Sequence, residues 1–297
     1  MADDIHNIIT EVVIKAISEH PLKIEKIGGM TNTNYYCETK NTKTVVRLPG
    51  ENTNILINRG NEKNNCQLAT ALGINPKLYY YNVDSGIKIT EYVNNAITLT
   101  PKIINKKINL KNAALLLQSL HQSDIIFKNK FNVFEEYNRY LSNLNRGEIS
   151  YPNFNETESY FLKLEKRLNQ LGIHLSPCHN DPVPENFIYN ENSYYLIDWE
   201  YSGMNDSSWD IAALCEESNL SDDDENVFLN YYLNDSTSEL ENIKEKILIY
   251  KICQNYLWSI WTLIKEKNEN LFGSYGIDRY KKCKAQIETH KEKYATN

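Results

Sequence analysis

The sequence predicts an α+β fold built as two lobes, and the order of its patterns carries this prediction. Short strand patterns fill most of the first third of the chain, and helical patterns fill most of the remainder. Runs of strands followed by runs of helices are typical of α+β proteins. The change of pattern near residues 91–95 predicts a first lobe of residues 1–93 and a second lobe of residues 94–297.

The first lobe is predicted to begin with a helix over about residues 5–19, which ends near Pro21. Glycine and Lys-Asn-Thr turn signals separate the strands that follow, and a second helix is expected from about Leu56 to Gly73. The predicted strands are Leu22–Ile27, Asn34–Thr39, Thr44–Leu48, Tyr79–Tyr81 and Ile87–Tyr92.

The second lobe is predicted to be mostly helical, with one β interruption at residues 186–198. Its expected helices cover about residues 110–123, 155–171, 208–218, 223–233 and 240–267.

Charge and cysteine usage limit the function classes. The net charge is −7 and the Lys and Arg residues are scattered, which argues against nucleic acid or an anionic membrane as a partner. The acidic start "MADDIHNIIT" is unlike a signal peptide, and no apolar run is long enough to span a bilayer. Six widely spaced cysteines indicate reduced thiols in a cytoplasmic protein rather than disulfides or a metal site.

The β interruption carries the clearest candidate site. "CHNDPVPENF" (178–187) precedes "LIDWEYSG" (196–203), and two apolar runs flank a four-residue loop, which predicts a hairpin. Pairing its strands sets Asn186 opposite Ile197 or Asp198. An amide oxygen and a carboxylate at one end of a hairpin suit Mg²⁺. Asp181 lies five residues before Asn186, close enough to face the same space.

His-x-Asp-x-x-x-x-Asn, an apolar hairpin and Ile-Asp together resemble the catalytic core of the protein-kinase-like phosphotransferases. The variant here is most similar to choline kinases, particularly their bacterial branch. The segments "IGGMTNTNYY", "VVRLPG", "INRGNEKNN" and "LWSIWTLIKE" follow in that family's order. The resemblance implies a small β-rich N-lobe, a larger helical C-lobe, and ATP- and Mg²⁺-dependent phosphorylation of choline to phosphocholine.

The resemblance also implies the residues that bind ATP. Arg47, at the end of a strand, would grip the phosphates and pair with Glu62 on the next helix. The alternative is that both are solvated surface charges. The turn containing Gly29, Thr31 and Asn32 would cover the phosphates, although it lacks the pattern GxGxxG and a plain hairpin turn is equally compatible.

Asp181 is expected to be the catalytic carboxylate that accepts the proton of the substrate hydroxyl. His179 is expected to brace the catalytic loop. Asn186 and Asp198 would bind the metal ion. Pro182 stands where the family pattern leads us to expect Leu or Cys, which bears on the geometry of the loop rather than on its chemistry.

Choline presents a quaternary ammonium, which proteins hold with aromatic faces and a carboxylate. Trp258 and Trp261 are spaced to share one helix face, a spacing that also suits core packing. The family match favours a binding role for this pair. It adds the aromatic residues Tyr201 and Tyr275, and the carboxylate of Glu216 with the neighbouring Glu217 as its alternative.

Other functions stay open at this stage. An ethanolamine kinase or an aminoglycoside phosphotransferase would share the catalytic core, and a catalytically inactive choline-binding protein would share the cage. The leading prediction is a cytoplasmic choline kinase with a small-molecule substrate, and a homodimer is left open.

Overall fold

The structure, a computed structural model, describes residues 2–29, 32–50, 57–234, 240–267 and 272–294. The chain divides into two compact units, one of Met1–Thr100 with Pro184–Ser202 and one of Pro101–Val183 with Gly203–Asn297. The lobes expected at residues 1–93 and 94–297 remain a prediction.

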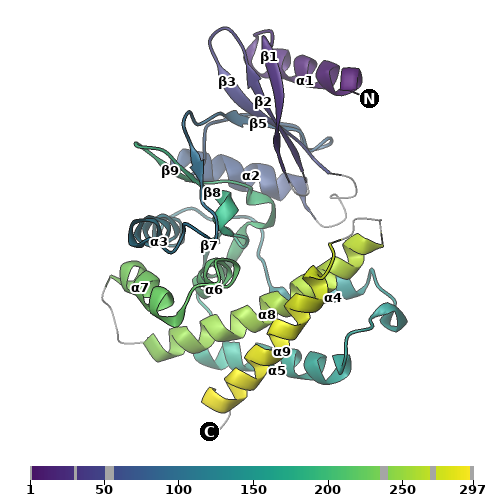
Figure 1. Cartoon of the computed structure of the whole chain (residues 1–297), viewed down its shortest axis with the longest axis vertical. Helices are drawn as coiled ribbons and strands as arrows, with labels where there is room; N and C mark the ends of the chain where they lie inside the picture. Colours follow the sequence, from purple (N-terminus) through teal and green to yellow (C-terminus); the bar gives the residue numbers. More distant parts are fainter. Residues whose placement is uncertain (1, 30–31, 51–56, 235–239, 268–271, 295–297) are drawn as a thin grey trace. The chain divides into compact units, whose positions relative to one another are not determined.

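The first unit is built on an antiparallel sheet (Figure 1). Among the described residues its strands lie in the order β1-β2-β3-β5-β4. Their bounds are β1 Lys23–Gly28, β2 Thr33–Glu38, β3 Lys43–Leu48, β4 Leu78–Tyr81 and β5 Lys88–Glu91. All five predicted strands are therefore confirmed, with ends that differ by at most one residue.

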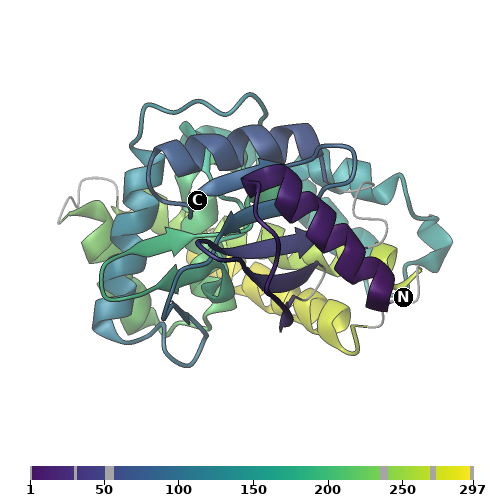
Figure 2. The ribbon, with the colours of Figure 1, turned by 90° about the horizontal axis from the view of Figure 1, so that it is seen from above.

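Helix α1 (Ala2–Ile17) packs on this sheet, and Figure 2 shows it crossing the strands. Ile9 and Val13 are one helical turn apart, so they share a face. Both are buried together with Cys37 from β2, Val46 from β3 and Ile89 from β5. This apolar cluster is the core that fixes the helix on the sheet.

Helix α2 (Arg59–Ala71) follows the sheet's first three strands. It begins after Asn58, whose side chain accepts a hydrogen bond from the backbone N–H of Asn61 at 3.1 Å. The predicted start at Leu56 lies outside the described residues. A second small sheet, in the order β6-β8-β9, joins Ile97–Thr98, Phe187–Tyr189 and Tyr194–Leu196.

The second unit is mostly helical. Its helices are α3 Lys107–His121, α4 Val133–Leu141, α5 Phe154–Leu171, α6 Ser207–Glu217, α7 Asp222–Leu233, α8 Leu240–Glu266 and α9 Tyr275–Tyr294. Helices α8 and α9 pack against each other, as Figure 1 shows in green and yellow. Strands β7 (Leu175–Cys178) and β10 (Gly203–Asp206) form an antiparallel pair beside α6.

The five predicted helices of this region are confirmed, but α4, α9, β7 and β10 were not predicted. Tyr275 is the first residue of α9. The sequence of α9 has few apolar residues and buries Arg279 and His290, so its periodicity is weak.

All six cysteines are free thiols and all are buried. Among the helices described, none combines the length and the apolar character needed to cross a membrane.

Replacing Ile9 by alanine tests the core of the first unit. Ile9 is fully buried, so Ile9→Ala should lower the free energy of unfolding by about 2–5 kcal/mol through lost contacts and a cavity. Ile8, its neighbour on the same helix, is 43% exposed, and Ile8→Ala is the matched control. Urea unfolding measures both, and equal effects would contradict the assigned face of α1.

Candidate active site

The β8–β9 hairpin brings Asn186 and Asp198 to its open end, which confirms the predicted register. Phe187 pairs with Leu196. The backbone N–H of Ile197 donates to the carbonyl of Asn186 at 2.9 Å. Asp198 follows directly, and its side chain is 33% exposed. Asn186 and Asp198, which are expected to bind a metal ion, therefore lie next to the paired ends of β8 and β9.

Trp199 holds the backbone of the preceding residue, Asp198, in place. Its indole N–H donates at 3.0 Å both to the carbonyl of Leu196 and to the side chain of Asn75, and the whole ring is buried. The backbone N–H of Leu196 also donates to the carbonyl of Ile74 at 2.8 Å. These bonds tie the hairpin to the segment after α2, and they hold Asp198 in a left-handed conformation with φ of 68°.

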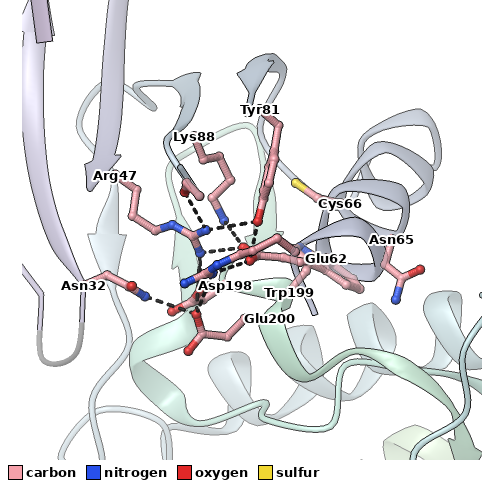
Figure 3. Close-up of polar contacts among 12 residues, drawn as sticks. Asn32, Arg47, Glu62, Asn65, Cys66, Tyr81, Lys88, Asp198, Trp199 and Glu200 are labelled. Carbon is pink, nitrogen blue, oxygen red and sulfur yellow. Dashed lines mark hydrogen bonds and ion pairs between the residues drawn. The ribbon is translucent and has the colours of Figure 1, made fainter. Parts of the chain in front are cut away.

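Arg47 and Glu62 form the predicted ion pair, as Figure 3 shows. Arg47 Nη1 lies 2.5 Å from Glu62 Oε1, 3.3 Å from Asp198 Oδ1 and 3.6 Å from Glu200 Oε2. Both members of the pair are buried, which rules out solvated surface charges. Burial disfavours the charge of Arg47, but the three carboxylates raise its pKa above the ordinary value.

Glu62 also accepts from three side chains that the sequence analysis did not single out. Lys88 Nζ lies 3.3 Å from Oε1, while Arg59 Nη1 and the Tyr81 hydroxyl lie 2.7 and 2.5 Å from Oε2. Burial alone would raise the pKa of Glu62, yet Arg47 and Lys88 hold it well below its usual range. Lys88 lies opposite Arg47 in the β3–β5 register, which brings both cations to Glu62.

Glu200 was not predicted from the sequence either. Its side chain is buried and accepts from the Asn32 amide at 3.2 Å. Burial, and then the charge of Asp198, raises the pKa of Glu200 to about 7. The carboxylates of Glu62, Asp198 and Glu200 lie within 4.8 Å of one another. Oxygen ligands crowded in this way are the donor set that Mg²⁺ takes.

The predicted phosphate-covering turn is only partly described, because Thr31 lies outside the described residues. Gly29 has φ of 124°, and a Cβ there would lie 1.8 Å from the carbonyl oxygen of Asn32. Only glycine fits this position. Asn32 also accepts from the backbone N–H of Gly50 at 3.3 Å, so its side chain bridges Gly50 and Glu200.

In the second unit, Asp210 holds the loop that carries Asp181. Its carboxylate accepts from the backbone N–H groups of His179 at 2.7 Å and Asn180 at 2.8 Å. His179 is fully buried, and its Nδ1 accepts from the backbone N–H of Asp181 at 3.3 Å. These contacts are those of a brace for the loop, the role expected of His179.

Asp210 is fixed in turn by His121 at the end of α3. His121 Nε2 lies 3.0 Å from Asp210 Oδ2, and its Nδ1 lies 2.8 Å from the hydroxyl of Tyr232. The sequence analysis assigned neither Asp210 nor His121. They lie 89 residues apart, so spacing in the sequence gives no signal for the contact.

Trp258 and Trp261 lie on α8 with ring centroids 6.3 Å apart and planes at 88°. Both are largely buried. Trp261 also packs against Phe272 at 5.1 Å, and Lys265 Nζ lies 5.5 Å from the Trp261 ring. The pair therefore takes part in core packing, and one of its rings interacts with a cation of the protein.

Tyr275 begins α9 and is 38% exposed. The next residue, Gly276, lies close to α8: a Cβ there would be 2.7 Å from the Tyr151 hydroxyl and 3.0 Å from Thr262 Cβ. Thr262 donates to the carbonyl of Trp258 at 2.8 Å. The first turn of α9 thus packs on the segment of α8 that carries the Trp pair.

The pKa of Tyr275 is influenced by the charge of Asp181, on the loop after β7. Partial burial raises this pKa, Arg279 lowers it, and the charges of Glu217 and Asp181 raise it. Asp181 therefore lies within electrostatic reach of the Tyr275 hydroxyl. Tyr201 belongs to the first unit, where it ends the short 3₁₀ helix Trp199–Tyr201.

The two neighbouring glutamates at the end of α6 point to different partners. Glu216 accepts from Asn255 at 3.0 Å and Gln286 at 2.8 Å. Glu217 pairs with Arg279, which also donates to the Tyr275 hydroxyl. Glu217, the alternative in the sequence analysis, is therefore the carboxylate that shares Arg279 with Tyr275.

Replacing Asp210 by asparagine tests the brace of the catalytic loop. The amide NH₂ would face a backbone N–H donor, so Asp210→Asn should cost about 1–3 kcal/mol of unfolding free energy. Amide hydrogen exchange of His179 and Asn180 should quicken. Asp222, an exposed aspartate in the first turn of α7, gives the control Asp222→Asn. Unchanged exchange at both amides would contradict the assignment.

The family model for choline/ethanolamine kinase matches residues 24–284. Protein LicA of Haemophilus influenzae is 34% identical over 285 residues, which cover 91% of this chain and 81% of LicA.

Two solved structures are similar over almost their whole length. The choline kinase LicA from Streptococcus pneumoniae is 39% identical with a TM-score of 0.86, covering 96% of this chain and 99% of that one. A LicA structure in complex with AMP has the same identity and coverage and a TM-score of 0.85. The protein-kinase-like fold is confirmed, and the chain belongs to the choline/ethanolamine kinase family.

Proposed function

We propose that this protein transfers the γ-phosphoryl group of ATP to the hydroxyl of choline, with Mg²⁺ as the metal ion. Family membership and the similarity to a choline kinase support the reaction. The observation that carries the proposal is the buried Arg47–Glu62 pair beside Asp198, because it places a fixed cation next to a carboxylate suited to a metal ion.

The first unit would bind the nucleotide. Arg47 has a planar fork of donors that can hold phosphate oxygens, and Glu62 keeps that fork in place. Gly29 and Asn32 would cover the phosphates from the turn, together with Thr31. A LicA structure with AMP supports nucleotide binding by this fold.

The metal ion would be held by Asn186 and Asp198. Glu200 lies close enough to contribute, and burial together with the charge of Asp198 raises its pKa. When bound, Mg²⁺ would neutralise charge on the phosphates. The crowding of carboxylates supports this assignment, because a divalent cation relieves their mutual repulsion.

The second unit would supply the base and the choline end. Asp181 would accept the proton of the choline hydroxyl, on a loop held by His179 and Asp210. Trp258, Trp261 and Tyr275 would present aromatic faces to the trimethylammonium. The packing of the Trp pair and the close approach of Gly276 to α8 support this proposal.

The remaining cage assignments are proposals as well. Tyr201 would contribute a further aromatic face, and Glu216 or Glu217 would supply the carboxylate. We place the reaction in the cytoplasm, where six buried thiols stay reduced. The functional lobes are proposed as residues 1–93 for nucleotide and 94–297 for catalysis and choline.

A side-by-side assay tests the function. ADP release is measured with choline, ethanolamine and kanamycin at equal ATP and Mg²⁺. We expect choline to give the highest kcat/KM. A higher kcat/KM for ethanolamine would make the protein an ethanolamine kinase and contradict the choline proposal. Turnover of kanamycin alone would overturn it as well.

Asp181→Asn tests the base. The amide keeps the shape of the carboxylate but cannot accept a proton, so kcat should fall at least about a hundredfold, with KM for ATP nearly unchanged. Glu185→Gln is the control, because Glu185 is an exposed acid in the same motif. Near wild-type turnover of Asp181→Asn would remove Asp181 from the mechanism.

Arg47→Ala tests the phosphate contact. Losing a charge-assisted contact should raise KM for ATP about tenfold to a hundredfold and leave KM for choline nearly unchanged. Glu62 keeps Arg59 and Lys88 as partners, so the fold should survive. Arg139→Ala, which removes a partly exposed ion pair with Glu136, is the control. A larger effect on choline than on ATP would refute the role of Arg47.

A further inference from the structure

Arg279 occupies an unusual position among the residues expected to bind a cation. Its guanidinium lies 5.1 Å from the centre of the Tyr275 ring and donates to the Tyr275 hydroxyl at 3.0 Å. The same nitrogen, Nη2, forms the ion pair with Glu217. A buried cation of the protein thus contacts both an aromatic ring and a carboxylate of the predicted choline end.

The position of Arg279 is fixed by a hydrogen bond to Asn255 on α8. Its Nη1 donates to the side-chain oxygen of Asn255 at 2.9 Å. The NH₂ group of Asn255 donates to Glu216 at 3.0 Å and to Gln286 at 2.9 Å, so the amide can present only its oxygen to Arg279. Glu216 therefore sets the orientation of Asn255, and Asn255 holds Arg279 on Glu217.

The pairing changes what Glu217 can offer a substrate. A primary ammonium gains from a carboxylate that accepts its N–H groups, whereas a quaternary ammonium has no N–H to donate. An aromatic face attracts either cation. A carboxylate already bonded to Arg279 is a weaker hydrogen-bond acceptor. This weakens the binding of a primary ammonium and has little effect on a quaternary one.

We propose that Arg279 is a specificity-determining residue: by engaging Glu217, it disfavours primary ammonium substrates and leaves selection to the aromatic faces. This inference rests on the proposed function, because it assumes that Glu217 and Tyr275 face the substrate cation. Arg279 acts through Glu217 and does not itself contact the reacting atoms.

The experiment compares kcat/KM for choline and ethanolamine in the wild type and in Arg279→Gln. Releasing Glu217 should raise kcat/KM for ethanolamine about tenfold, mainly through KM, and change that for choline less than about threefold. The ratio of efficiencies should therefore fall, with KM for ATP unchanged. A ratio that stays constant would overturn the proposal.

Lys282→Gln is the matched control. Lys282 lies on the same helix and pairs with the neighbouring Glu216 at 3.3 Å, so its loss changes the net charge equally. In this variant the ratio of kcat/KM for choline to that for ethanolamine should remain at the wild-type value. If Lys282→Gln lowers the ratio as much as Arg279→Gln, the effect is one of general charge and the proposal fails.

A double variant separates selectivity from damage to the structure. In Arg279→Gln with Glu217→Gln, the gain for ethanolamine should disappear, because the released acceptor is no longer charged. Persistence of the gain would contradict the role of Glu217. Arg279→Lys, which keeps the charge, should restore most of the wild-type ratio, and it provides the test if Arg279→Gln does not fold.

Direct binding distinguishes this inference from the proposed function. Calorimetric titration of choline and ethanolamine reports selectivity without turnover. Selective choline binding that Arg279→Gln reduces would support the inference even if the wild type lacked kinase activity. A wild type that phosphorylates choline but whose binding preference ignores Arg279 would overturn the inference alone.

Discussion

The buried carboxylate of Glu62 organises the first unit. A lone charge at this depth would be strongly destabilising, and Glu62 is tolerated because Arg47, Arg59, Lys88 and Tyr81 all donate to it. Those donors come from β3, α2, β5 and β4, so satisfying one carboxylate brings four elements together. The direction in which Arg47 points, and with it the place of Asp198, is a consequence of this arrangement.

Helix α6 has a comparable role in the second unit. Asp210 in its first turn holds the loop of Asp181, and Glu216 and Glu217 in its last turn hold α8 and α9. Seven residues separate Asp210 from Glu217, about 10 Å along a helix. One short rigid element thus sets the distance between the loop of Asp181 and the contacts with α8 and α9.

Local patterns were enough to predict the parts of the site that lie close together in the sequence. The hairpin register followed from two apolar runs and a four-residue loop. The Arg47–Glu62 pair was instead implied by the resemblance to choline kinases. Arg59 lies three residues before Glu62 on α2, and this helical spacing was a signal that could have been read.

The remaining contacts depend on tertiary packing. His121 and Asp210 meet only because α3 and α6 belong to the same folded unit, and no pattern within either helix indicates it. Glu216 and Glu217 are adjacent, so about 100° of helix rotation decides which one faces Tyr275. Helix α9 escaped prediction because it buries Arg279 and His290 on a face that a hydrophobic pattern would leave to solvent.

The burial of all six thiols gives the molecule a built-in reporter of its own opening. Burial raises the pKa of Cys37 and Cys66 in the first unit, and raises that of Cys215 in the second to about 11. Little thiolate forms in the folded state, so alkylating reagents can react only when a segment opens. The rate of labelling at each cysteine would therefore time the opening of each unit separately, without any added probe.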